Sequence, residues 1–252
     1  MIPTQILRVL STIRTYDVRA LLMGGQACVL YGAAEFSRDL DLAVLATSAA
    51  LPKFAAAMDA LHATVIAVPG FERRFLERGH AVHFSVPDAA APPLRVDVMS
   101  RMRGVAEFEV LWERRTTIAI PDPAAAGEVM LEVMALEDLV TAKKTQRDKD
   151  WPMLRRLVDA SFAAARDGQV TDAQVEFWLA ELRSPEFLHE VVARWPAAAE
   201  RSPRPAVVAT RVNGDTDAAL AREQAEEMAA DREYWAPLRR ELESARREAR
   251  RT

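Results

Sequence analysis

The stretch VRALLMGGQACVLYGAAEFSRDLDLAV, residues 18–44, contains the pattern that decides the fold. A short apolar run ends at Gly24-Gly25 and precedes a segment rich in Ala and Leu, which is typical of a strand, a glycine turn and a helix. DLDLAVL (39–45) then alternates acidic and apolar residues before it becomes wholly apolar. This alternation predicts a second strand with one functional end.

Hydrophobic periodicity predicts further elements on both sides of this stretch. Up to residue 120 it indicates helices at 3–16 and 49–63 and strands at 81–86, 94–99 and 114–120. After the turn at Pro121-Asp122-Pro123 it indicates helices at 136–147, 150–165, 172–182, 185–195 and 217–250, with a loop at 202–217. We therefore expect an α/β (α+β) fold, with a mixed sheet and flanking helices in a domain at 1–122 and an α-helical domain at 123–252. The charged helix at 217–250 is expected to be a solvated surface helix.

Composition restricts the class of protein. The 252 residues are 50% hydrophobic and 28% charged, which provides a core and excludes a disordered or collagen-like chain. A net charge of −4 gives no sign of a protein that coats nucleic acid non-specifically. The single cysteine, Cys28, excludes an internal disulfide. Without a secretory signal or a run of about 20 apolar residues, the expected compartment is the cytoplasm and no membrane partner is expected.

Three groups of residues carry the chemistry. Glycines at Gly24-Gly25 let a phosphate approach the backbone, and a following helix start would present free N–H groups to an anion. Asp39 and Asp41 are two residues apart on a strand, so both carboxylates lie on one face, where a divalent cation such as Mg²⁺ would offset their repulsion. Asp97, in the strand LRVDVM, would complete a two-metal phosphoryl-transfer site if its strand is adjacent. The simpler interpretation of Asp97 is a surface ion pair with Arg95.

MGGQACVLYGAAEFSRDLDLAV (23–44) resembles the nucleotidyltransferase superfamily signature: a glycine pair after a strand, a helix, a Ser or Thr two residues before D-x-D, and a later third acid. The matching positions are Gly24, Gly25, Ser37, Asp39, Asp41 and Asp97. LEDLVTAKKTQRDKDW (136–151) resembles the corresponding helix of the abortive-infection AbiEii/AbiGii-type nucleotidyltransferases, which are toxin-like.

The resemblance implies a bacterial, metal-dependent transferase that moves an NMP from an NTP to a hydroxyl acceptor, either RNA (tRNA) or a small molecule. Asp39, Asp41 and Asp97 would be catalytic and hold two Mg²⁺ ions, and Gly24, Gly25 and Ser37 would contact the triphosphate. An antitoxin protein is a possible partner. Lys143 and Lys144 are expected on the first helix after the α/β domain, with one of them facing the acids.

Two departures from the superfamily pattern leave an alternative open. Gly25 stands where many relatives have serine, and Glu35 stands where many have arginine. A catalytically inactive nucleotide-binding or protein-interaction module that retains the fold is therefore the second hypothesis. The four histidines lack metal-ligand spacing, and the five tryptophans are expected to pack between helices.

Overall fold

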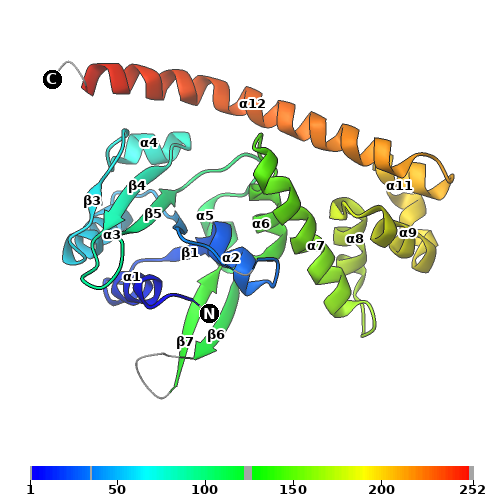
Figure 1. Ribbon diagram of the computed structural model, residues 1–252, viewed down its shortest axis with the longest axis horizontal. Helices are drawn as coiled ribbons and strands as arrows, with labels where there is room; N and C mark the ends of the chain where they lie inside the picture. Colours follow the sequence, from blue (N-terminus) through cyan, green and yellow to red (C-terminus); the bar gives the residue numbers. More distant parts are fainter. Residues whose placement is uncertain (1, 35, 122–126, 250–252) are drawn as a thin grey trace.

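The computed structural model describes residues 2–34, 36–121 and 127–249. Its centre is a seven-stranded sheet in the order β3-β4-β5-β2-β1-β7-β6 (Figure 1). The strands are β1 (Ala20–Met23), β2 (Leu40–Val44), β3 (Thr64–Val65), β4 (Val82–Val86), β5 (Leu94–Met99), β6 (Thr116–Pro121) and β7 (Glu128–Val133). The sheet is mixed, because β2–β5 and β1–β7 are parallel pairs while the other pairs are antiparallel.

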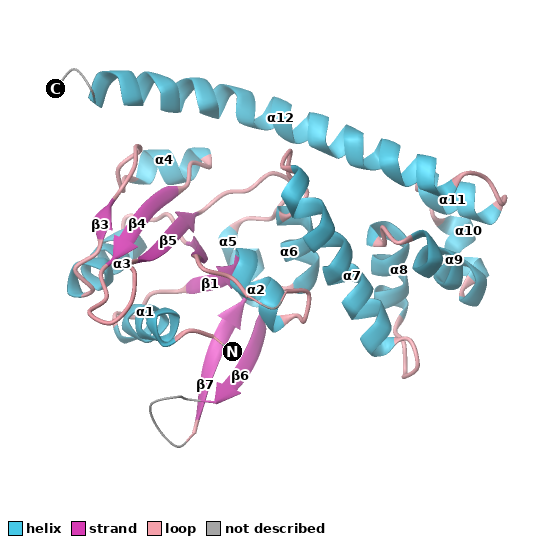
Figure 2. Ribbon diagram, viewed as in Figure 1, coloured by secondary structure: helices cyan, strands magenta, loops and turns pink. Residues whose placement is uncertain are grey.

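The helices of the sheet-bearing half are α1 (Thr4–Thr15), α2 (Gly24–Leu30), α3 (Ala50–Ala60), α4 (Arg73–Arg78) and α5 (Phe108–Glu113). The second half contains α6 (Leu136–Ala142), a 3₁₀ turn (Asp148–Asp150), α7 (Trp151–Ala165), α8 (Asp172–Glu181), α9 (Pro185–Arg194), α10 (Pro196–Arg201), α11 (Pro205–Arg211) and α12 (Thr216–Ala249). Figure 2 shows this division between a sheet with helices around it and a helical part.

The two faces of the sheet differ in burial. Along β4 and β5, alternate residues such as Val82, Phe84 and Val96 are almost fully buried, and the residues between them are partly exposed. Helix α3 covers the buried face, where its Phe54 ring lies 6.0 Å from that of Phe84. The opposite face carries the polar side chains of β2, β4 and β5. The two-residue alternation of the strands therefore places core residues on one face of the sheet and polar residues on the other.

The long helix α12 joins the two halves of the molecule (Figure 1). Near its start, Glu223 accepts hydrogen bonds from Arg183 (2.9 Å) and Arg204 (3.0 Å) of the helical half. Near its end, Glu241 pairs with Arg78 and with His80 (3.0 Å) beside the sheet. The expectation of a solvated surface helix is therefore incomplete, because these acidic side chains fasten the helix to both halves.

The expected fold class is confirmed, with corrections. The prediction that the chain is wholly helical after residue 122 is wrong, because β7 pairs with both β1 and β6. The predicted loop at 202–217 contains α11, which begins at Pro205, where proline fits because the first turn needs no N–H donor. The predicted helix at 136–147 ends at Ala142. The boundary between the two predicted domains, at 122 and 123, falls outside the described residues, and the division itself stays a prediction.

Across the described residues, no helix combines the length and the hydropathy that crossing a lipid bilayer requires.

Candidate active site

Four side chains form a row across the polar face of the sheet. In the strand register Met23 is opposite Asp41, Asp41 is opposite Asp97, and Asp97 is opposite His83. Residues paired across neighbouring strands point to the same face, so the two carboxylates face one another. Asp39 immediately precedes β2, and it lines one cavity together with Asp41 and Asp97. The prediction that the strand of Asp97 is adjacent to that of Asp39 and Asp41 is confirmed.

Gly24 provides the space that Asp41 occupies. A Cβ atom on Gly24 would lie 1.9 Å from Oδ2 of Asp41, and its φ of +64° is in the left-handed region that favours glycine. The backbone N–H of Gly25 donates to the same Oδ2 at 3.3 Å. A Cβ on Gly25 would in turn lie 2.3 Å from Ser37 Oγ. The glycine pair thus positions a carboxylate, and its contact with a triphosphate stays a prediction.

The two facing carboxylates have opposite electrostatic environments. Burial, followed by the like charge of Asp97, raises the pKa of Asp41 above its ordinary value. Burial would also raise the pKa of Asp97, but hydrogen bonds from His83 and Arg95 (each 2.8 Å) outweigh it and lower that pKa. His83 and Arg95 therefore stabilise the negative charge of Asp97, whereas burial and the neighbouring Asp97 disfavour the negative charge of Asp41.

The two predicted lysines have different partners in the structure. Lys143 caps the C-terminus of α6 and Lys144 follows it, so neither lies within the helix as expected. The Lys143 ammonium lies 3.7 Å from Asp150, and its positive charge offsets part of the rise in the pKa of Asp41. Lys144 instead binds Glu181 of α8 at 2.7 Å. Of the pair, Lys143 is the one directed toward the acids.

The loop that carries these lysines is held by contacts to α12 and α7. Asp231 of α12 accepts a hydrogen bond from the Gln146 N–H at 2.8 Å. The indole N–H of Trp151 donates to the carbonyl of Thr145 at 2.9 Å. These contacts replace the hydrogen bonds that would have continued α6, which explains why the helix ends early.

A cavity of about 480 Å³ lies between the row of acids and this loop. Its sheet side carries Asp39, Asp41, Asp97, His83 and Arg95, and its other walls include Lys143, Lys149, Arg103, Asp231 and Trp235. Of the predicted phosphate-contacting residues, Gly24, Lys143 and Lys144 line it, and Gly25 and Ser37 are not in the lining formed by the described residues. The cavity joins anionic and cationic walls, as a metal-bound phosphate would require.

The chemistry of the available donor atoms fits Mg²⁺. Carboxylate oxygens are the ligands that this hard cation prefers, and a bound cation would reverse the rise in the pKa of the partly buried Asp41. No three His, Cys, Asp or Glu side chains within the described ranges are grouped to hold a metal ion. Arg95 donates two hydrogen bonds to the carboxylate of Asp97, at 2.8 and 3.0 Å. Metal binding would therefore require Arg95 to release Asp97 and the acids to converge.

The residues that α12 contributes to the cavity were not predicted from the sequence. Asp231 is only 2% exposed, and its partners Arg103 and Gln146 lie more than 80 positions away in the chain. A helical stripe of Met228, Asp231, Trp235 and Leu238 was the available signal, because these residues recur at spacings of three and four on one face. Glu35, which motivated the inactive alternative, lies outside the described residues.

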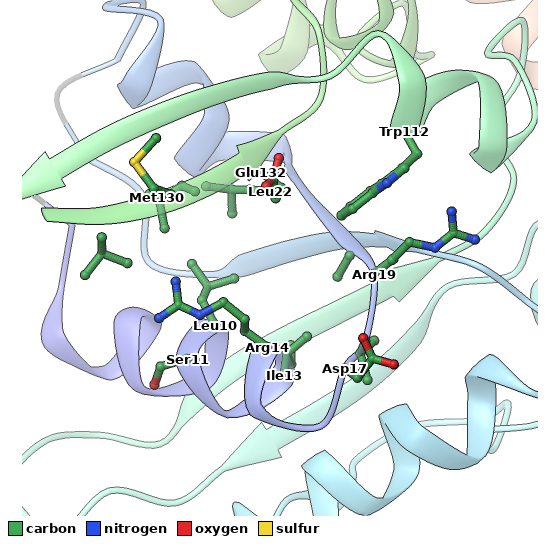
Figure 3. Close-up of a pocket in the computed structure, with 14 residues that line it drawn as sticks. Leu10, Ser11, Ile13, Arg14, Asp17, Arg19, Leu22, Trp112, Met130 and Glu132 are labelled. Atoms are coloured by element: carbon green, nitrogen blue, oxygen red, sulfur yellow. The ribbon is translucent and has the colours of Figure 1, made fainter.

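A second cavity, of about 240 Å³, lies on the opposite face of the sheet (Figure 3). Leu22 lines it, whereas its neighbour Met23 lines the acidic cavity, so the two spaces are separated by β1. Figure 3 shows Trp112 and Arg19 at one end and Leu10 and Arg14 of α1 at the other. None of the predicted site residues lines this cavity.

No protein-family model matches the chain, and no curated protein matches it. Among solved structures, ANT(2")-Ia in complex with adenylyl-2"-tobramycin is similar at 12% identity and a TM-score of 0.36, over 77% of this chain and 98% of that one. An antigenic nucleotidyltransferase-like protein from Paracoccidioides brasiliensis is similar at 11% identity and a TM-score of 0.40, over 78% of this chain and 92% of that one.

Proposed function

We propose that the protein is a Mg²⁺-dependent nucleotidyltransferase that moves an NMP from an NTP to a hydroxyl acceptor. The observation that carries the proposal is the pairing of Asp41 with Asp97 across β2 and β5, in a cavity that Asp39 and Lys143 also line. Like charges this close repel, and such an arrangement persists most readily where a cation binds between them. Asp39, Asp41 and Asp97 are the residues that would hold the ions.

In this proposal the acceptor oxygen forms a bond to the α-phosphorus while the bond from that phosphorus to the β-phosphate oxygen breaks and pyrophosphate leaves. Bound Mg²⁺ would supply charge neutralisation at the phosphates. Asp97 orients the acceptor hydroxyl and accepts its proton, Lys143 binds the phosphates as a point charge, and the Gly25 N–H keeps Asp41 in place.

The acceptor and the biological role belong to the proposal as well. Both an RNA such as tRNA and a small hydroxylic molecule remain candidates, and the net charge of −4 favours a short footprint on any nucleic acid. The resemblance of residues 136–151 to AbiEii/AbiGii-type proteins supports a toxin role in a bacterial toxin–antitoxin pair, in which an antitoxin protein would be the partner.

The test is incubation with each of the four NTPs, labelled at the α-phosphate, together with Mg²⁺ and tRNA, total RNA or a panel of small hydroxylic compounds. We expect label transfer to one acceptor class with an equal amount of pyrophosphate, and loss of both in Asp41→Asn. Transfer that is unchanged in Asp41→Asn, or no transfer with any NTP and acceptor, would contradict the proposal.

A second candidate function is an inactive nucleotide-binding or protein-interaction module. The contacts that favour it are the hydrogen bonds of Arg95 and His83 to Asp97, which satisfy this carboxylate without a metal ion. Label transfer separates the two candidates. An enzyme transfers label from an NTP to an acceptor in Mg²⁺, whereas an inactive module binds its ligand without transfer.

A further inference from the structure

One of the five tryptophans differs from the others in its surroundings. Trp151 and Trp178 are buried in the core, at 4% and 0% exposure, and Trp112 and Trp195 pack against it. Trp235 is partly buried, yet it lies outside that core and lines the acidic cavity. The expectation that all five pack between helices is therefore wrong for Trp235.

The polar edge of the Trp235 ring is also unlike the others. Trp151 donates its indole N–H to Thr145, and Trp178 donates to Ser161 Oγ at 3.2 Å. Within the part of the chain that the structure describes, Trp235 Nε1 has no such acceptor. Its aromatic neighbour is Tyr234, with ring centroids 5.7 Å apart and planes nearly perpendicular. An indole that neither packs in the core nor bonds to the protein is available to a ligand.

Contacts of two neighbouring side chains hold this part of α12 in position. Asp231, one helical turn earlier and on the same face of α12, is fixed by the Gln146 N–H and by Arg103 at 3.2 Å. The hydroxyl of Tyr234 lies against Gly79, where an added Cβ would be 3.0 Å away. The helix is thus anchored to other elements just before Trp235, and the Trp235 side chain forms part of the cavity wall.

We propose that Trp235 is the stacking platform for the base of the nucleoside triphosphate. The inference rests on the proposed function and adds the residue that binds the base. The carboxylates and Lys143 meet the needs of the charged phosphates, whereas a base needs an aromatic or apolar surface. Trp235, together with the lining residues Met99 and Met102, provides that surface in the same cavity. Stacking on an aromatic ring tolerates every base, because each has a π-face.

The test compares the binding of the four NTPs with that of inorganic tripolyphosphate by calorimetry, in Mg²⁺ and without acceptor. In Trp235→Leu we expect NTP affinity to fall by about 10-fold and tripolyphosphate affinity to stay unchanged, because only the NTP has a base to stack. Trp235→Phe should retain most of the affinity. The matched control is Trp112→Leu, in the cavity on the opposite face, which should change neither.

Two calorimetric outcomes overturn the inference alone, namely unchanged NTP affinity in Trp235→Leu, or equal losses for NTP and tripolyphosphate. A wild-type protein that binds none of the four NTPs overturns the proposed function and the stacking inference together. Should Trp235→Leu fail to fold, tryptophan fluorescence decides. NTP should quench emission in the wild type and in Trp112→Phe but not in Trp235→Phe, and quenching retained in Trp235→Phe overturns the inference.

Discussion

Substitution of Gly24 by alanine tests how Asp41 is positioned. The added Cβ would lie 1.9, 2.4 and 2.6 Å from Oδ2, Cγ and Cβ of Asp41, all far inside van der Waals contact. It would also place a side chain at a φ of +64°. Because the conflict involves nearly the whole Asp41 side chain, a small rotation of the carboxylate cannot relieve it.

Gly32 offers a matched control for the backbone part of this cost. Its φ is +75°, and a Cβ there would meet nothing within 4 Å. Gly32→Ala should therefore cost only the left-handed penalty, about 1–2 kcal/mol. Gly24→Ala should add an overpacking cost of about 1–3 kcal/mol. At about 2–4 °C per kcal/mol for a chain of this size, the Tm of Gly24→Ala should lie about 2–12 °C below that of Gly32→Ala.

The assay combines thermal melts with metal titration and label transfer. Gly24→Ala should lose metal binding and transfer, because Asp41 is displaced from the Gly25 N–H, whereas Gly32→Ala should keep both. Equal Tm values for the two variants, with metal affinity retained in Gly24→Ala, would refute the placement of Asp41 against Gly24.

Three further predictions follow from single residues. Burial raises the pKa of Cys28 to about 11 from 9.0, so the folded state keeps its proton where the unfolded state has lost it. This shift should lower the free energy of unfolding by about 2–3 kcal/mol between pH 9 and 11, and chemical denaturation should find the fall smaller by that amount in Cys28→Ala. Lys143→Ala should raise the KM for nucleotide by about 10-fold. Lys144→Ala, which breaks the pair with Glu181, should instead lower the Tm. Steady-state kinetics that show equal KM values for the two variants would contradict this assignment. Asp41→Asn should abolish transfer while keeping or slightly raising the Tm without metal, because it removes a partly buried charge that Asp97 repels. A clearly lower Tm would contradict this reasoning.

The central part of the fold was predictable because its signals are local. Strand alternation around the acids determines which residues share a face, and the two-residue spacing of Asp39 and Asp41 places both on the polar side. Strand β7 escaped prediction because EVMLEV (128–133) has acidic residues within a short apolar pattern. Helices α4, α5 and α10 have six residues each, which is too short to show helical periodicity.

The remainder of the site depends on contacts between distant segments. Nothing near Asp97 in sequence shows that His83 bonds to it, since that contact follows from the register of β4 and β5. The loop after α6 is held by Asp231, 85 positions from its partner Gln146. Trp235 likewise reaches the cavity only because α12 extends from one half of the molecule to the other.

The most direct test of the central claim is calorimetric titration of Mn²⁺, as a stand-in for Mg²⁺, in the presence of NTP and without acceptor. The wild-type protein should bind the ion, and Asp39→Asn, Asp41→Asn and Asp97→Asn should each weaken binding by 10-fold or more, the factor that about 1.4 kcal/mol represents. Unchanged Mn²⁺ affinity in Asp41→Asn and Asp97→Asn, with both variants folded, would contradict the assignment of these facing carboxylates as the metal site.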